Sequence, residues 1–276
     1  MQTLTEIRNL LEERGLSPKR SLGQNFLIDH NLITKLVDAS GAAPGDTVLE
    51  VGPGTGTLTE ALLETGARVI ACELDTDLCS LMRDRFGGRD NFTLIEGDCL
   101  ESKRTLAPAI AQALGDPTKP FRLVANLPYG AGTPLLLVLM TRFPNCQSMF
   151  VTIQREVGER LLAHPGDDAY GSISIVARLT MNMKSLAIVG PSCFWPKPRV
   201  ESMMLEATRT DPGPADRGPI DLPALAELSQ KLFTQRRKQI GRACHNLGLK
   251  LPEDVDSTTR VTGLEPEMVV RLLQAQ

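Results

Sequence analysis

The chain has 276 residues, of which 42% are hydrophobic and 23% charged, and its formal net charge at pH 7 is −3. This length allows one large domain with a small second one, and the composition is that of an ordinary globular protein. No apolar run is long enough to span a bilayer, and the N-terminus carries Glu6, Glu12 and Glu13 without the apolar core of a secretory signal. We therefore expect a cytoplasmic protein with no membrane partner, which can bind nucleic acid only through a local basic patch.

The cysteines and histidines indicate neither a metal site nor a catalytic triad. The six cysteines form no Cys-x-x-Cys pair, and His30, His164 and His245 are scattered along the chain. We expect reduced, mostly buried thiols and no bound metal.

Hydrophobic spacing predicts helices at residues 3–14 and 31–39, separated by a basic, amide-rich segment at 19–27. From residue 48 onward strands and helices alternate, which predicts a parallel sheet covered on both faces, the α/β Rossmann-like class. The strands expected after the first lie at 68–73, 92–96, 121–125 and 148–154, and the helices at 76–86, 102–114 and 133–142.

The last third of the chain changes character. Two further strands, at 185–189 and 202–208, flank a proline-rich turn and predict a terminal hairpin. Residues 211–223 are rich in Pro, Gly and Asp and indicate a linker, after which the leucine spacing is helical. We expect a ligand-binding domain at 1–210 and a small α-helical domain at 211–276.

The first strand of the alternating region ends in a glycine turn, Val48-Leu49-Glu50-Val51-Gly52-Pro53-Gly54-Thr55-Gly56. A strand, a tight glycine turn and a helix form a ligand cradle in open α/β sheets, so we expect Gly52 and Gly54 to bind a cofactor. The spacing is not the dinucleotide pattern, because Thr57 stands where the last glycine would be. Glu50 would repel a pyrophosphate but suits a cationic ligand, so the turn favours S-adenosylmethionine over a nicotinamide cofactor.

Two acidic residues follow the next two strands. Glu73 ends the second strand about twenty residues past the glycine turn, where a carboxylate accepts hydrogen bonds from ribose hydroxyls. Nicotinamide enzymes use the same arrangement, so Glu73 alone does not discriminate. Asp98 follows the third strand and can accept from the adenine amino group, although a solvated loop aspartate is the alternative.

The most specific motif is Asn126-Leu127-Pro128-Tyr129, directly after the fourth strand. The exocyclic amine of adenine is a poor nucleophile because its lone pair is delocalised into the ring. The side-chain oxygen of Asn126 and the carbonyl of Leu127 can each accept one N–H and pull the nitrogen towards tetrahedral geometry. Pro128 fixes the backbone, and Tyr129 offers a ring on which the base can stack. The alternative is a strand-to-helix turn with a surface tyrosine.

Two downstream segments carry cations suited to RNA. In the segment from Phe194 to Val200, Phe194 could close the other face of the target base while Lys197 and Arg199 hold phosphates. The alternative is a proline-stiffened hairpin with a core phenylalanine. Further on, the cluster Arg236-Arg237-Lys238 has Lys231 and Arg242 nearby, and on a helix Lys231, Lys238 and Arg242 would share one face. A solvated face is the alternative there.

Together these motifs resemble the ribosomal RNA adenine dimethyltransferase family, and in particular its small-subunit (16S) branch. The resemblance covers residues 17–247. Its motifs are, in order, the lid Gly23-Gln24-Asn25-Phe26-Leu27, the glycine turn, Glu73, Asp98, Asn126 to Tyr129, Gln154-Arg155-Glu156-Val157, Arg160-Leu161, Tyr170-Gly171, Phe194 to Val200 and Leu232 to Lys238. The last of these is typical of the 16S branch.

The resemblance implies a class I S-adenosylmethionine-dependent methyltransferase sheet with a small helical domain. It also implies that the cofactor is contacted by Asn25, Leu27, Gly52, Glu73, Asp98 and Asn126. The implied reaction is dimethylation of the amino groups of two adjacent adenosines near the 3′ end of 16S rRNA, in the 30S subunit or its precursor. We expect a monomeric enzyme.

One departure from the family and several rival functions stand beside this interpretation. Gly130-Ala131-Gly132 replaces the usual Asn-Ile-Ser after the tyrosine, which bears on the rigidity of the loop under the target base. The rival substrates are 23S rRNA and DNA adenine. A non-catalytic assembly factor is the alternative from another class, yet Asn126, Pro128 and Tyr129 are all present. A nicotinamide oxidoreductase would need a further glycine and a histidine near the site.

Overall fold

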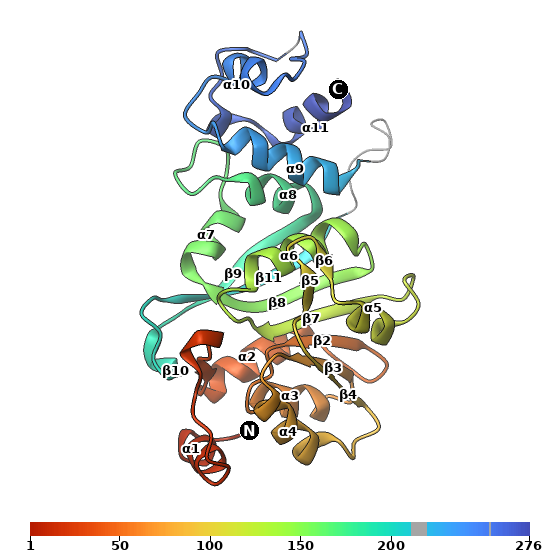
Figure 1. Cartoon of the computed structure of the whole chain (residues 1–276), viewed down its shortest axis with the longest axis vertical. Helices are drawn as coiled ribbons and strands as arrows, with labels where there is room; N and C mark the ends of the chain where they lie inside the picture. Colours follow the sequence, from red (N-terminus) through yellow and green to blue (C-terminus); the bar gives the residue numbers. More distant parts are fainter. Residues whose placement is uncertain (211–219, 254) are drawn as a thin grey trace.

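The computed structural model describes residues 1–210, 220–253 and 255–276. Within these residues a seven-stranded sheet forms the centre of the molecule, in the order β4-β3-β2-β7-β8-β11-β9 (Figure 1). β11 runs antiparallel to its two neighbours, and the pairs from β4 to β8 are parallel. The strands of this sheet are β2 (Thr47–Val51), β3 (Arg68–Glu73), β4 (Phe92–Glu96), β7 (Phe121–Asn126), β8 (Cys146–Gln154), β9 (Met181–Val189) and β11 (Ser202–Arg209).

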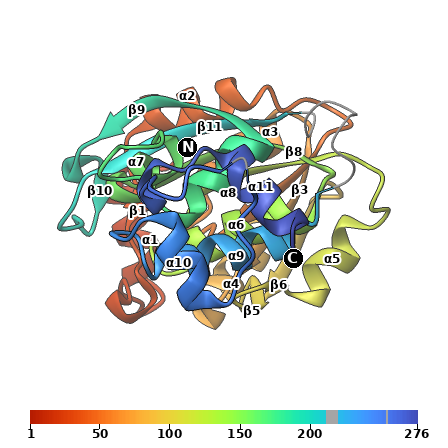
Figure 2. The ribbon, with the colours of Figure 1, turned by 90° about the horizontal axis from the view of Figure 1, so that it is seen from above.

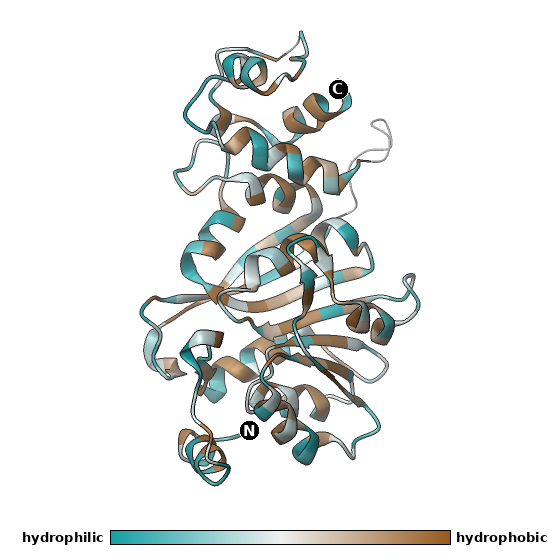
Figure 3. Ribbon diagram, in the orientation of Figure 1, coloured by the Kyte–Doolittle hydropathy of each residue, from teal (hydrophilic) through white to brown (hydrophobic). Residues whose placement is uncertain are grey.

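Helices cover both faces of this sheet, as the alternating sequence predicts. Each face of the sheet packs against its own group of helices and forms a separate hydrophobic core with it. The first group is α1 (Leu4–Glu12), α2 (His30–Ser40), α3 (Thr57–Glu64) and α4 (Thr76–Phe86), and the second includes α5 (Pro108–Leu114) and α6 (Gly132–Arg142). The strands accordingly appear largely hydrophobic in Figure 3. Among the described residues, no helix combines the length and the apolar character needed to cross a membrane.

The predicted strands at 68–73 and 92–96 are confirmed, as are the helices at 3–14, 31–39, 76–86 and 133–142 to within a few residues. The predicted helix at 102–114 is wrong in its first half. There the chain forms a small hairpin, β5 (Leu100–Ser102) and β6 (Thr105–Leu106), and α5 begins only at Pro108. Pro108 is well suited to start a helix because a residue in the first turn has no intrahelical partner for its N–H.

The predicted terminal hairpin is confirmed as an antiparallel pair of β9 and β11. Because β11 inserts between β8 and β9, the last strand among the described residues is internal and the sheet ends at β9. The connection between them contains η2 (Pro191–Cys193) and β10 (Phe194–Trp195). β10 pairs with β1 (Phe26–Leu27) far up the chain, and Figure 2 shows the two strands together on one side of the molecule.

A third core belongs to the helices at the top of Figure 1, beyond the β9 edge of the sheet. It includes Tyr170 and Ile175 together with Leu225 and Leu228, and the Tyr170 hydroxyl donates to the Leu264 carbonyl at 2.8 Å. The elements that contribute to it are α8 (Ser172–Thr180), α9 (Leu222–Phe233), α10 (Ile240–Leu247), η4 (Val261–Gly263) and α11 (Pro266–Gln274). The preceding helix, α7 (Arg155–Leu162), packs through Leu161 into the core that contains α5 and α6.

The predicted linker at 211–223 can be compared with the structure only at its C-terminal end. Residues 211–219 lie outside the described residues, and at its other end Leu222 and Pro223 already belong to α9. There the prediction is wrong, because Asp221 caps the helix by accepting from the Ala224 N–H at 3.0 Å. The division into domains at 1–210 and 211–276 stays a prediction, and α8 of the first segment packs against α9 of the second.

Candidate active site

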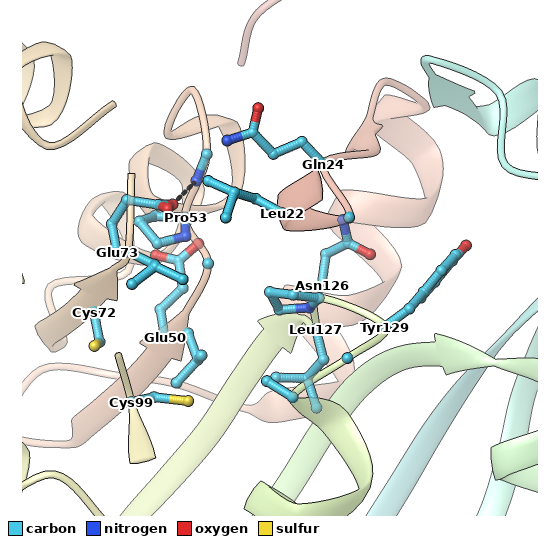
Figure 4. A pocket seen from close by; sticks show the side chains of 18 of the residues that line it. Leu22, Gln24, Glu50, Pro53, Cys72, Glu73, Cys99, Asn126, Leu127 and Tyr129 are labelled. Atoms are coloured by element: carbon cyan, nitrogen blue, oxygen red, sulfur yellow. Dashed lines mark hydrogen bonds between the residues drawn. The ribbon is translucent and has the colours of Figure 1, made fainter. Parts of the chain in front are cut away.

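A pocket of about 630 Å³ opens at the carboxyl ends of β2, β3, β4 and β7, where parallel sheets bind their ligands (Figure 4). Its volume lies in the range of small-molecule and cofactor sites. Every residue predicted to bind the cofactor lines it, as do four of the five predicted catalytic residues, of which Asn126 belongs to both groups. These are Asn25, Leu27, Gly52, Gly54, Glu73, Asp98 and Asn126, followed by Leu127, Pro128 and Tyr129.

The glycine turn brings three parts of the site together. Gly52 and Gly54 have φ angles of 72° and 61°, which side-chain-bearing residues rarely adopt. A Cβ at Gly52 would lie 2.8 Å from Cγ of Pro128, and one at Gly54 would lie 2.8 Å from the ring of Phe26. Both glycines are therefore required by the close packing of the turn against the Asn126–Tyr129 segment and the lid.

Glu73 is a buried acceptor held in a fixed orientation. One carboxylate oxygen accepts from the Gly54 N–H at 3.1 Å and the other from the Asp75 N–H at 2.9 Å. Burial raises the pKa of Glu73, and these backbone donors work in the opposite direction. The arrangement presents a carboxylate to the pocket beside the glycine turn, as an acceptor for ribose hydroxyls requires (Figure 4).

Glu50 lies in the same pocket and is 1% exposed. Burial raises its pKa to about 8, although the Thr59 hydroxyl donates to it at 2.6 Å and thereby favours the charged form. A buried carboxyl of this kind gains most from a positively charged ligand, because burial and the nearby Glu73 both oppose its charged form. The donor set therefore fits the sulfonium and ammonium groups of S-adenosylmethionine better than a pyrophosphate.

The amide of Asn126 is oriented by the lid. Its Nδ2 donates to the main-chain carbonyl of Asn25 at 3.0 Å, which leaves Oδ1 as an acceptor in the pocket. The next residue is fixed as well, since the Leu127 N–H donates to the Thr152 carbonyl on β8 at 3.0 Å. The Pro128 carbonyl accepts from the N–H groups of Ala131 and Gly132, which leads the chain directly into α6.

Tyr129 is held by a residue that the sequence did not indicate. Its hydroxyl lies 3.0 Å from Oγ of Ser202, which is fully buried at the start of β11. Burial raises the pKa of Tyr129, so the phenol is neutral at physiological pH. No local pattern could have revealed this contact, because the two residues are 73 positions apart.

The hairpin of β5 and β6 also lines the pocket, through Leu100, Ser102 and Lys103 among others. These residues were missed because the segment was predicted to be helical. Asp98, just before the hairpin, accepts from the Leu100 N–H at 2.9 Å and so holds the start of this wall.

The structure does not bring Phe194 to the pocket. Its side chain is 2% exposed and lies in the core shared with the lid, where Phe194 pairs with Leu27 in the β1–β10 ladder. A role in stacking on the target base therefore stays a prediction, and it requires this segment to move. Lys197 and Arg199 beyond it are exposed to solvent.

The proposed basic helix face in the C-terminal part is wrong. α9 ends at Phe233 and α10 begins at Ile240, so Lys231 and Lys238 do not share a helix. Arg236, Arg237 and Lys238 are exposed on the turn between these helices, and Arg236 donates to the Asp168 carbonyl at 3.0 Å. The cluster is thus presented by a turn that is tied to the loop before α8.

The parallel strands of the mixed sheet, the glycine turn, the oriented Glu73 and the Asn-Leu-Pro-Tyr segment define a methyltransferase of the S-adenosylmethionine-dependent class. The ribosomal RNA adenine dimethylase family model matches residues 15–276. The chain belongs to this family, and it is an enzyme that uses S-adenosylmethionine to methylate ribosomal RNA adenine.

Individual relatives agree with the family match. The ribosomal RNA small subunit methyltransferase A of Phenylobacterium zucineum (strain HLK1) is 38% identical over 248 residues, which cover 90% of this chain and 83% of that protein. The protein of the same name from Moorella thermoacetica (strain ATCC 39073 / JCM 9320) is 36% identical over 93% of this chain and 88% of its own length.

Solved structures show the same fold at lower identity. A dimethyladenosine transferase from Plasmodium falciparum has a TM-score of 0.70 at 22% identity and covers 90% of this chain and 95% of that one. The 23S rRNA methyltransferase ErmE has a TM-score of 0.65, also at 22% identity, and covers 91% of this chain and 99% of its own.

Proposed function

We propose that this enzyme dimethylates the exocyclic amino groups of two adjacent adenosines near the 3′ end of 16S rRNA, within the assembling 30S subunit. The observation that carries the proposal is the amide of Asn126, whose nitrogen is engaged by Asn25 while its oxygen is left to accept. The choice of the small subunit is supported by relatives named small subunit methyltransferases at 36–38% identity over most of the chain.

The chemistry assigned to the site is the activation of an aromatic amine. When bound, S-adenosylmethionine supplies a methyl group made electrophilic by a positively charged sulfur. Oδ1 of Asn126 and the carbonyl of Leu127 each accept one N–H of the adenine amine, which withdraws its lone pair from the ring. These acceptors act most strongly as the nitrogen becomes tetrahedral, so they stabilise the transition state more than the bound substrate. Pro128 holds the Leu127 carbonyl in place, and Tyr129 supports the base.

Each of the cofactor-binding residues is assigned to a different part of S-adenosylmethionine. Glu73 takes the ribose hydroxyls, and Asp98 takes the adenine amino group. Gly52, Gly54 and Glu50 would hold the methionine end, and the lid residues Asn25 and Leu27 would also contact the cofactor. The buried, doubly held carboxylate of Glu73 and the pocket that all these residues line support this assignment.

The RNA is held by cations outside the pocket. Lys197 and Arg199 are exposed next to β10, and Arg236, Arg237 and Lys238 are exposed on the turn between α9 and α10. Exposed Lys and Arg side chains bind phosphates without reading sequence, so they position the particle while the pocket selects the base. The enzyme acts as a monomer in the cytoplasm, on the 30S subunit or its precursor.

The test is to supply labelled S-adenosylmethionine to unmethylated 30S particles, naked 16S rRNA, naked 23S rRNA and DNA, and to map the label. We expect label on two adjacent adenosines near the 3′ end of 16S rRNA, with two methyl groups on each amine. Label on naked 23S rRNA or DNA instead would replace this substrate with one of its rivals. Binding to particles without any transfer would indicate an assembly factor.

A further inference from the structure

The lid, taken together with the residues that lead into it as Lys19–Leu27, is fastened to the N-terminus of α4 by the buried carboxylate of Asp75. The exposed carboxylate of Asp77 adds a second contact, with its Oδ2 2.7 Å from Nζ of Lys19. Nζ of Lys19 lies 2.7 Å from Oδ1 of Asp75, and Nε2 of Gln24 donates to Oδ2 of the same residue at 2.8 Å. The side chain of Asp75 is 2% exposed, so both bonds reach it inside the protein. Gln24 also accepts from the Lys19 N–H at 2.7 Å, which closes the lid segment on itself.

Asp75 is equally well fixed on its own side. Its carboxylate caps α4 by accepting from the Asp77 N–H at 3.1 Å, and its N–H donates to Glu73 at 2.9 Å. Glu73 in turn accepts from Gly54 in the glycine turn. The point to which the lid is fastened is therefore hydrogen-bonded to Glu73, which lines the cofactor pocket.

The other end of the lid reaches the reacting part of the site. The Asn25 carbonyl accepts from Nδ2 of Asn126 at 3.0 Å, and the Asn25 side chain donates to the Gly23 carbonyl at 3.0 Å. Gly23 has a φ angle of 67°, and a Cβ there would lie 3.9 Å from the Tyr129 backbone nitrogen. The lid thus spans from Asp75 to the Asn126–Tyr129 segment.

From this continuity we propose that Lys19, Gln24 and Asp75 form a latch that keeps the lid where the Asn25 carbonyl orients the amide of Asn126. The inference rests on the role given to Asn126 under the proposed function. An asparagine amide has two orientations, and only one presents oxygen to the adenine amine. Lys19 is then a positioning residue for methyl transfer, although it touches neither the base nor the methyl group.

The latch is electrostatic over the whole physiological pH range. Hydrogen bonds to Asp75 and Asp77 raise the pKa of Lys19 to about 12. Burial by itself would raise the pKa of Asp75, but its bonds to Lys19 and Gln24 outweigh burial and lower it. Both partners are therefore charged near neutrality.

A matched control exists in the same region. Arg14 forms an ion pair with Asp84 at 2.8 Å, which also joins the N-terminal segment to α4 but does not involve the lid. Three variants are compared with the unmodified protein: Lys19→Met, Lys19→Arg and Arg14→Met. For each, calorimetry gives the Kd of S-adenosylmethionine, steady-state kinetics give kcat at saturating cofactor, and thermal unfolding gives the Tm.

We expect Lys19→Met to weaken cofactor binding and to lower kcat, each by about threefold or more, a modest effect because Lys19 is 40% exposed. Lys19→Arg should restore both values, since a guanidinium also pairs with a carboxylate. Arg14→Met should leave both unchanged. Trypsin should also cut Lys19→Met faster than the unmodified protein at Arg20, which lies in the lid.

A Tm shift for Lys19→Met with unchanged Kd and kcat would reduce the latch to an ordinary stabilising contact and overturn the proposal. A weaker Kd with an unchanged kcat at saturating cofactor would overturn the link to Asn126. If the unmodified enzyme methylates no 16S substrate, the proposed function fails, while the calorimetric and proteolytic measurements still decide whether Lys19 fastens the lid.

Discussion

The contribution of Glu50 to the stability of the fold depends on pH, because its carboxyl group is buried. It is 1% exposed, and burial raises its pKa from the ordinary value of 4.5 to about 8. The folded state therefore favours the neutral form, and this contribution to stability is fully present below about pH 4.5. It is lost as the pH rises through about 8, because the unfolded chain ionises freely while the folded one resists.

The first prediction concerns Glu50→Gln, which keeps an acceptor for the Thr59 hydroxyl but cannot ionise. The free energy of unfolding of the unmodified protein should fall, relative to the variant, as the pH rises from about 5 to about 8. Urea unfolding at several pH values checks this. Stability curves that stay parallel across the range would mean that Glu50 does not titrate with a raised pKa.

The second prediction separates two neighbouring asparagines. Asn126→Ala removes the acceptor proposed to act on the adenine amine, so kcat should fall by about a hundredfold with little change in the KM for RNA. Asn25→Ala keeps its main-chain carbonyl and should mainly raise the KM for the cofactor. Steady-state kinetics on both variants test this division. An effect of Asn126→Ala confined to KM would contradict its role in the transition state.

At the scale of elements, the turn between α9 and α10 presents cations without being a helix face. Within this turn Arg236 has a structural contact, since it donates to the Asp168 carbonyl. Arg237 and Lys238 are exposed, which makes them the better test of RNA binding. Changing Arg236 alone would confuse loss of this contact with loss of a phosphate contact.

The third prediction is that Arg237→Glu with Lys238→Glu weakens binding to 30S particles. The slope of the logarithm of the binding constant against the logarithm of the salt concentration should become shallower by about two, one for each lost phosphate contact. Methylation at saturating substrate should be less affected. Binding measured between about 50 and 200 mM salt gives the slope, and the Tm checks that the fold is intact. Unchanged affinity and slope would mean that the turn is only solvated.

Elements with a local signal could be predicted from the sequence, and those set by distant contacts could not. β3 and α4 follow from local apolar patterns and appear where predicted. α8 was missed because β-branched residues such as Ile173, Ile175 and Val176 favour strands, and its packing against α9 overrides that preference. The insertion of β11 between β8 and β9 is also a long-range choice.

The residues of the candidate site also fall into those that a local motif predicts and those that only distant contacts bring together. The glycine turn, Glu73 and the Asn126–Tyr129 segment are short contiguous motifs, and all of them line the pocket as expected. The bond from Lys19 to Asp75 joins residues 56 positions apart, and no sequence pattern marks it. The role of Phe194 stays a prediction, since its chemistry suits a base while its position in the β1–β10 ladder buries it.

On the scale of the whole molecule, a two-residue ladder joins the segment that lines the cofactor pocket to the segment proposed to bind RNA. Phe26 pairs with Trp195 and Leu27 with Phe194, and the Ile28 N–H donates to the Cys193 carbonyl at 2.9 Å. Leu27 lines the cofactor pocket, whereas Lys197 and Arg199 follow directly after β10. A lid held in one position therefore also holds the start of the segment that carries Lys197 and Arg199, the cations proposed to bind RNA.

The last prediction follows from this ladder, because two ligands that favour the same lid position must strengthen each other's binding equally. S-adenosylhomocysteine, which fills the pocket without allowing transfer, should raise the affinity for unmethylated 30S particles by about fivefold. Particles should raise the affinity for S-adenosylhomocysteine by the same factor. Fluorescence titrations in both orders measure the two factors. In Lys197→Glu with Arg199→Glu, RNA affinity should fall while the coupling factor persists, since the ladder is intact. Equal RNA affinities with and without S-adenosylhomocysteine in the unmodified protein would show that the β1–β10 ladder does not transmit the state of the lid.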